Sequence, residues 1–406
     1  MRVVNTIRNL IFSLLIAVCL FSWIGNKVAV DQGYAEYEEK SYLEGREFQT
    51  FPDLTSASFS EGTFQDEFED YLCDHMPEHD DVILANAAMQ RSIISLASLP
   101  FGFEAYESYF GSDYVYLPEY SAVLEMPMST SDLPAESLNT YAEEYSALME
   151  ANPDVDWLVY ICDRPSTSLA NPAVVMSSDV ADYEYIRENF LDLLPESCIV
   201  VDGSYTDSAE YCAEHYLTDH HWNIYGAIDA YEEIIAALGK EAIDLSGVFV
   251  AYEGPFWGSE ARSGLVLDEG DVVYDVEYER SSLRVAVGGD EQDVSCLAES
   301  WEEGYTGHVN AEKFSNSYAE CFHDDWGLLE IENLDIEDGE SLLIIGDSYS
   351  NCMERFFAES YQYVYVIDPR RVGDSVDIQE FIDENGIDDV AFIETAKNID
   401  KLENIL

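Results

Sequence analysis

Runs of apolar residues alternate with helix-like spacing along most of the chain. Buried strands are predicted where apolar residues are consecutive, at 155–161, 198–201, 342–346, 363–367 and 390–394. Helices are predicted where they recur every three or four positions, near 64–72, 82–94, 138–148, 183–194, 223–238, 349–361 and 378–383. This alternation favours an α/β fold, with a parallel sheet covered by helices on both faces.

Two stretches differ from this alternation. Residues 109–117 predict a short strand pair with a turn at Gly111-Ser112. Between about 245 and 330, short alternating strands such as 272–278 and 283–287 are separated by turns. We interpret 245–330 as a β-rich insertion in the α/β fold or as extended loops.

The N-terminal residues predict a targeting segment. Two arginines precede an apolar stretch from Leu10 to Gly25. Basic flanks remain in the cytoplasm, so we expect the rest of the chain to be exported. We favour an uncleaved membrane anchor facing outside, with cleaved secretion as the alternative. The expected organisation is an anchor at 1–30, an acidic stalk at 31–50 and one domain at 51–406.

The composition is strongly acidic. The 406 residues include 18 Lys and Arg but 83 Asp and Glu, which gives a formal net charge of -65. Nucleic acid and anionic lipid would be repelled, so neither is an expected partner. The acidic residues are scattered, and we interpret them as solvated surface. A salty habitat, bound cations or solubility would each account for them.

The eight cysteines give no metal or redox motif, because none of them forms a CxxC pair. Seven follow the apolar N-terminal stretch. An exported chain would allow one or two disulfides, but the spacing does not define a pairing.

Ser348 is the candidate nucleophile. It follows the strand 342–346 through the turn Gly346-Asp347, and a helix is expected after it. A serine at a strand-to-helix turn projects from the sheet edge, with helix N–H groups beside it. The alternative is an ordinary turn, because Gly, Asp and Ser are common turn residues.

The run Asp219-His220-His221-Trp222 offers a base for that serine. A neutral imidazole can take the hydroxyl proton, and a carboxylate on the other ring nitrogen fixes its tautomer. In extended chain, residues two apart point to the same side. We therefore predict Asp219 as the orienting acid and His221 as the base. Taken singly, Asp219 is typical of a helix cap and Trp222 of a core residue.

A metal site is the second interpretation of this region. His215 lies four residues before Asp219 and close to the two histidines. Adjacent histidines rarely ligate one ion together, and no second carboxylate cluster completes a ligand set. We therefore expect neither a metal nor another cofactor.

Further candidates follow the strand 363–367 or contain aromatic side chains. Arg370 and Arg371 lie where a strand end lines the crevice of an open α/β sheet. Arg370 would bind an oxyanion or pair with an acid, and for Arg371 we favour an ion pair. An aromatic cluster would stack on sugars or, as we favour, pack in the core; it contains Tyr252, Phe256 and Trp257.

Taken together, these motifs resemble the DHHW family of the SGNH hydrolase-like superfamily, which is related to alginate O-acetylation proteins. The resemblance is carried by Asp219-His220-His221-Trp222, Gly346-Asp347-Ser348-Tyr349 and Asp368-Pro369-Arg370. It implies a flavodoxin-like α/β/α fold over 51–406. It also implies a triad in the chain order Asp219, His221, Ser348, with Tyr349, Trp222 and Arg370 binding the oxyanion or substrate.

The resemblance further implies a serine O-acyltransferase outside the cytoplasm. Its acceptor would be a cell-surface or exported polysaccharide, and a membrane-bound O-acyltransferase would supply the acyl group. A carbohydrate acetylesterase with the same triad and a non-catalytic glycan-binding or assembly protein are the alternatives.

Overall fold

The computed structural model describes residues 46–406 except 77, 177–178, 253, 308–314 and 373–375. Before residue 46 it describes single positions only, at 21, 25, 28, 32, 40, 41 and 43. The anchor predicted at 1–30 and most of the stalk predicted at 31–50 therefore lie outside the described residues.

The chain divides into two compact units, residues 1–94 and 95–406. In the first, the Arg46 guanidinium pairs with the buried Asp74 carboxylate at 2.7 Å. The elements of this part are β1 (Lys40–Ser41), β2 (Arg46–Glu47), α2 (Ser56–Glu61), α3 (Thr63–Asp74) and α4 (His79–Ser98), which crosses the boundary. Within the described residues, one helical stretch, His79–Phe101, has the length and composition to span a membrane, a weak criterion that soluble proteins also meet.

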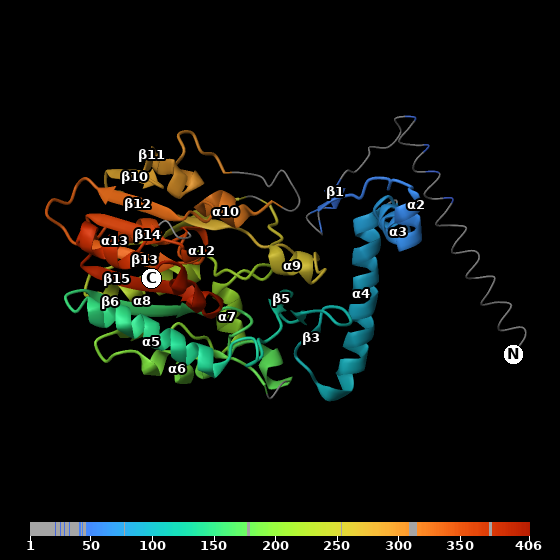
Figure 1. Cartoon of the computed structure of the whole chain (residues 1–406), viewed down its shortest axis with the longest axis horizontal. Helices are drawn as coiled ribbons and strands as arrows, with labels where there is room; N and C mark the ends of the chain where they lie inside the picture. Colours follow the sequence, from blue (N-terminus) through green and yellow to red (C-terminus); the bar gives the residue numbers. More distant parts are fainter. Residues whose placement is uncertain are drawn as a thin grey trace, which may run out of the picture. The chain divides into compact units, whose positions relative to one another are not determined.

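The second unit is built around a mixed sheet (Figure 1). Its strand order is β11 (Asp290–Gln292), β10 (Leu283–Val287), β12 (Leu328–Asn333), β14 (Tyr363–Ile367), β13 (Ser341–Gly346), β15 (Asp389–Thr395), β6 (Asp156–Cys162) and β7 (Ile199–Val201). The last five are parallel, and β10, β11 and β12 pair antiparallel. The fold class is thus α/β, as predicted, but only part of the sheet is parallel.

Helices pack on both faces of this sheet. Because side chains alternate along a strand, Leu342 and Ile344 face one apolar core, while Leu343 and Ile345 face another. The first core contains α8 (Ile224–Ala237), α10 (Ser317–Phe322) and α11 (Glu354–Phe357). The second contains α5 (Ala135–Ala151), α6 (Tyr183–Asn189) and α13 (Ile378–Asn385).

Smaller elements complete the unit. Two further sheets join β3 (Tyr106–Glu107), β4 (Tyr114–Leu117) and β5 (Ala122–Glu125), and β8 (Gly247–Val250) with β9 (Tyr274–Glu277). The remaining helices are α7 (Ser208–Glu214), α9 (Ser259–Ser263) and α12 (Pro369–Val372), with short 3-10 turns at η1 (Leu99–Phe101), η2 (Pro172–Met176), η3 (Leu191–Leu193), η4 (Val294–Leu297), η5 (Glu299–Trp301) and η7 (Ala396–Asn404). The seven cysteines in the described residues are free thiols.

Within the stretch 245–330, the strands β10 and β11 extend the main sheet beside β12. One predicted helix needs correction. The helix predicted at 349–361 is reduced to α11, and turns precede it. The Ser350 hydroxyl donates to the Asp347 carbonyl oxygen and the Glu354 carboxylate, and such side-chain bonds compete with helical ones.

Candidate active site

The turn after β13 holds Ser348 at the carboxyl end of the sheet. The chain leaves β13 for β14 on one side and later returns to β15 on the other, so these strand ends form the topological switch point at which open α/β sheets bind ligands. The Asp347 carboxylate fixes the turn, because it accepts from the Tyr349 N–H at 3.0 Å and the Thr395 N–H at 2.9 Å. Ser348 is partly exposed between buried neighbours.

The loop 216–221 brings the base to the same place. An isolated β-bridge pairs His215 with Trp222 and so joins the two ends of the loop. The Asp271 carboxylate then accepts from the backbone N–H groups of Leu217 at 2.9 Å and Thr218 at 2.8 Å. The loop is thus tied to a distant segment of the chain before it reaches the two histidines.

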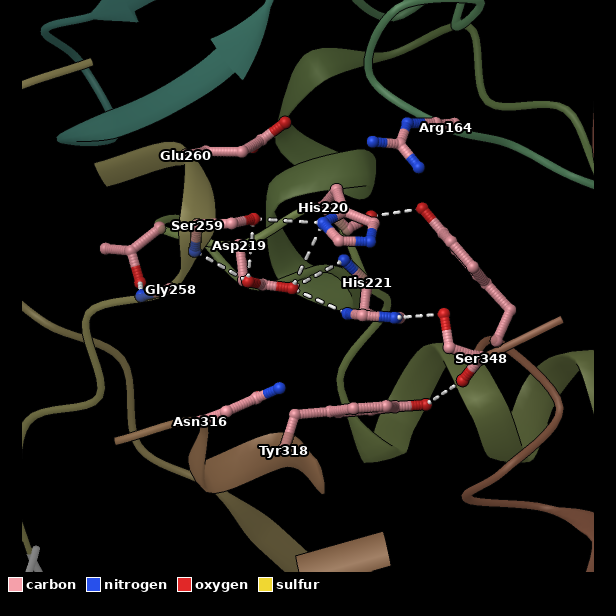
Figure 2. Close-up of polar contacts among 12 residues, drawn as sticks. Arg164, Asp219, His220, His221, Gly258, Ser259, Glu260, Asn316, Tyr318 and Ser348 are labelled. Carbon is pink, nitrogen blue, oxygen red and sulfur yellow. Dashed lines mark hydrogen bonds and ion pairs between the residues drawn. The ribbon is translucent and has the colours of Figure 1, made fainter. Parts of the chain in front are cut away.

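Ser348, His221 and Asp219 form one hydrogen-bonded chain (Figure 2). The His221 Nδ1 atom lies 2.6 Å from Asp219 Oδ1, and its Nε2 atom lies 2.8 Å from Ser348 Oγ. A carboxylate can only accept, so Nδ1 carries the ring proton and Nε2 is free to accept from the serine. This geometry suits proton transfer from Ser348 to His221.

The second carboxylate oxygen of Asp219 is also occupied. It accepts from the Ser259 N–H at 2.8 Å and from the Ser259 hydroxyl at 3.1 Å. An added Cβ on the preceding Gly258 would lie 2.2 Å from the Asp219 Cβ, so only glycine fits there without a shift. The Gly258-Ser259 segment thus fixes the orienting acid.

Electrostatics keep Asp219 ionised. Its burial opposes ionisation, but the imidazoles of His220 and His221 and the hydrogen bonds it accepts hold its pKa well below the usual value. Burial lowers the pKa of His220 to about 3, and the neighbouring His221 adds to this shift. His220 is therefore neutral near pH 7.

His220 lies beside the Asp219–His221–Ser348 hydrogen-bonded chain and contacts its acid, with Nδ1 3.5 Å from Asp219 Oδ1. Its ring centroid is 4.0 Å from that of His221, and its Nδ1 atom lies 3.1 Å from the Ser259 hydroxyl. Among the described residues, the ligand atoms of Asp219, His220 and His221 lie within 4.8 Å of one another, as a metal site would require. His215, the fourth ligand considered, lies outside this group, and its Nδ1 atom contacts the Tyr211 carbonyl oxygen at 3.2 Å.

Tyr349 and Trp222 are both buried next to the hydrogen-bonded chain of Asp219, His221 and Ser348. The Trp222 Nε1–H donates to the Tyr349 carbonyl oxygen at 3.0 Å, and the Tyr349 hydroxyl donates to the His220 carbonyl oxygen. These contacts join the serine turn to the histidine loop. The N–H of Ser348 donates no hydrogen bond to the residues described, which leaves it available for an oxyanion.

The two arginines of the 368–371 segment are held by carboxylates. The Arg370 Nε atom donates to Asp368 at 2.9 Å, and its Nη2 atom pairs with Asp325 at 3.0 Å. Arg371 pairs with the same Asp325 at 3.0 Å and is more exposed. In the aromatic cluster, Phe256 and Tyr252 are buried in the core, as favoured above, whereas Trp257 is only half-buried.

Two contact residues were missed in the sequence. Ser259 belongs to the Phe256-Trp257-Gly258-Ser259 run, where the aromatics drew the interpretation instead. Tyr318 stacks on His221 and bonds the Ser348 backbone. No local pattern marks either residue, because both contacts depend on how residues of the 245–330 stretch fold back onto the sheet.

A family model matches the part of the chain that contains the candidate site. The model of the DHHW protein family matches residues 195–367, a range that contains Asp219, His221 and Ser348. This confirms the resemblance to the DHHW family. A search of curated proteins finds no match.

Two solved structures share the fold at low identity, and a third is more distant. A DHHW family protein from Eubacterium siraeum is 18% identical, with a TM-score of 0.55, over 72% of this chain and 95% of that one. PatB1 from Bacillus cereus, solved with a sulfonyl adduct, is 18% identical, with a TM-score of 0.53, over 68% and 93%. AlgX from Pseudomonas aeruginosa is 14% identical, with a TM-score of 0.31, over 76% and 66%.

Proposed function

We propose that this DHHW-like chain is a serine O-acyltransferase that acetylates a cell-surface or exported polysaccharide. The observation that carries the proposal is the continuous path from Ser348 Oγ through His221 to Asp219, at 2.8 Å and 2.6 Å. The path joins residues 127 positions apart and ends on a carboxylate that is kept ionised. A turn without a catalytic role would require neither this hydrogen-bonded path, nor the long sequence separation of its ends, nor the ionised carboxylate.

The first half-reaction forms an acyl-enzyme. Ser348 Oγ attacks the carbonyl carbon of an acetyl donor while His221 Nε2 takes the hydroxyl proton, and Asp219 stabilises the imidazolium. The Ser348 N–H, with Arg370, would stabilise the developing oxyanion. Collapse of the intermediate breaks the bond to the donor's leaving group, which takes the proton from His221.

The second half-reaction returns the serine. A sugar hydroxyl loses its proton to His221 and attacks the acyl carbon, and the bond to Ser348 Oγ then breaks as that oxygen takes the proton from His221, which leaves the ester on the glycan. Water in place of the sugar would make the same residues an acetylesterase. The partial exposure of Ser348 favours keeping this second candidate, since solvent can reach the acyl group.

The cellular setting is part of the proposal. Export and anchoring through residues 1–30 would place the domain on the outer side of the membrane. A membrane-bound O-acyltransferase would then pass the acyl group to Ser348. The net charge of -65 would repel the chain from anionic lipid headgroups.

The test compares ester cleavage by the full chain with and without oligosaccharide acceptors. A chromogenic acetyl ester should acetylate the peptide that carries Ser348, detected by mass spectrometry, and acceptors should receive the acetyl group. His221→Gln should lose both signals, while His220→Gln, a change at the neighbouring ring that does not touch Ser348, should retain acylation. Hydrolysis without transfer would identify an esterase. No acylation of Ser348 by any ester would end the catalytic proposal.

A further inference from the structure

Tyr318 contacts both the ring of the base His221 and the backbone of the nucleophile Ser348. Its ring stacks on the His221 imidazole, with centroids 4.1 Å apart and an interplanar angle of 10°. Its hydroxyl donates to the Ser348 carbonyl oxygen at 2.8 Å (Figure 2). One side chain thus spans the nucleophile's turn and the base's ring.

The ring of Tyr318 is itself held from behind. Tyr216 and Phe322 meet it edge-on, at centroid distances of 6.2 Å and 5.3 Å. Tyr318 is 2% exposed, and its burial raises the pKa of the phenol well above the usual value. Its hydroxyl therefore remains a donor at every pH at which the triad would work.

We infer that Tyr318 is a positioning residue for the proposed reaction, setting the plane of the His221 ring and the orientation of the Ser348 turn. An aromatic face stacked on an imidazole also favours its cationic form, which arises when Ser348 gives up its proton. The inference rests on the proposed function, because it assigns a role in activating Ser348.

The inference extends to the stretch 245–330. Tyr318 lies on α10 and Ser259 begins α9, so this stretch contacts the hydrogen-bonded chain at both ends. Ser259 holds Asp219, and Tyr318 holds His221 and Ser348. The stretch 245–330 therefore helps to position the residues of the site.

Two variants separate the hydroxyl from the ring. Tyr318→Phe removes the hydroxyl, with its bond to the Ser348 carbonyl oxygen and its contact with the Cys352 thiol, and Tyr318→Leu also removes the stack. Tyr216→Phe is the matched control, because its buried hydroxyl has no hydrogen-bond partner in the described residues and it touches Tyr318 from behind. Thermal unfolding of each variant reports whether it folds.

The readout is the rate at which an arylsulfonyl fluoride modifies Ser348, measured by mass spectrometry from pH 5 to 9. We expect Tyr318→Phe to slow modification by about three- to tenfold and Tyr318→Leu by about 100-fold. The half-maximal pH should fall in Tyr318→Leu, where the imidazolium loses its aromatic support, and stay unchanged in Tyr318→Phe. Tyr216→Phe should match the wild type.

The outcomes distinguish the two proposals. If wild-type Ser348 is not modified above the level of a denatured sample, the proposed function fails. If it is modified and both folded Tyr318 variants react at the wild-type rate with the wild-type pH profile, only the role of Tyr318 is overturned. A slower rate with an unchanged profile in Tyr318→Leu would overturn the role of the aromatic face.

Discussion

The Nε2 atom of His221 lies 2.8 Å from the Oγ atom of Ser348, although 127 positions separate the two residues in the chain. Several independent contacts maintain this distance. Asp271 anchors the histidine loop, Asp347 anchors the serine turn, and Trp222 bonds the Tyr349 carbonyl oxygen between them. The approach of base and nucleophile is therefore a product of the whole fold.

Replacing the orienting acid should remove most activity and preserve the fold. In Asp219→Asn the amide is close to isosteric, but it can present an N–H to His221 and stabilise the wrong tautomer. We expect kcat/KM for an acetyl ester to fall by about 100- to 10,000-fold, with Tm within a few degrees of the wild type. Activity within twofold would show that Asp219 does not orient His221.

Gly258 should be more sensitive than the serine that follows it. Its φ of -72° is open to any residue, so the effect of Gly258→Ala comes from space alone: the new Cβ would lie 2.4 Å from Asp219 Oδ2. We expect about 100-fold lower kcat/KM, the typical cost of displacing a catalytic group by about 1 Å. Ser259→Ala keeps the N–H bond and should lose about tenfold or less. Equal activities of Gly258→Ala and Ser259→Ala would show that the added Cβ does not displace Asp219.

Parts of this architecture could be predicted because their physical signal is local. The strands β13, β14 and β15 are runs of apolar residues, and Asp219 with His221 offers a base and acid at one spacing. The helix predicted at 349–361 was wrong for most of its length, because the Ser350 hydroxyl bonds to Asp347 and Glu354 there and such bonds compete with helical ones. The role inferred for Tyr318 depends on a tertiary contact with His221, which residue spacing along the sequence cannot predict.

The two adjacent arginines should differ in their effect on catalysis. Both pair with Asp325, but Arg370 also binds Asp368, and its side chain is 25% exposed against 56% for Arg371. If Arg370 assists the oxyanion, Arg370→Met should lower kcat by about 100-fold, with KM little changed. Arg371→Met removes a surface pair and should stay within twofold. Similar kinetics for both variants would assign Arg370 to structure.

The acidic surface should make stability depend on ionic strength. With a net charge of -65, repulsion within the folded chain is screened as the Debye length falls from about 30 Å at 0.01 M salt to about 3 Å at 1 M. We expect Tm to rise by roughly 3 to 10 °C over that range, equally with sodium and choline chloride. A rise with calcium at millimolar concentration alone would indicate bound cations instead of screening.

A buried acid beside the site should make the protein less stable as the pH rises. Burial raises the pKa of Glu394, on β15, to about 8, and the nearby Asp347 carboxylate adds to the shift. In the unfolded chain this group would ionise near pH 4.5. Between these values the folded state holds a proton that the unfolded state has lost, so the free energy of unfolding falls as the pH rises.

Glu394→Gln tests this directly, since the amide oxygen can still accept the Tyr145 hydroxyl that Glu394 accepts. Between pH 5 and 8, urea unfolding should show the wild type losing about 3 to 5 kcal/mol more than the variant. Asp163, with a pKa raised by burial to about 7, gives both proteins a shared decline. Parallel stability curves for the two proteins would mean that Glu394 ionises in the folded state as readily as in the unfolded chain.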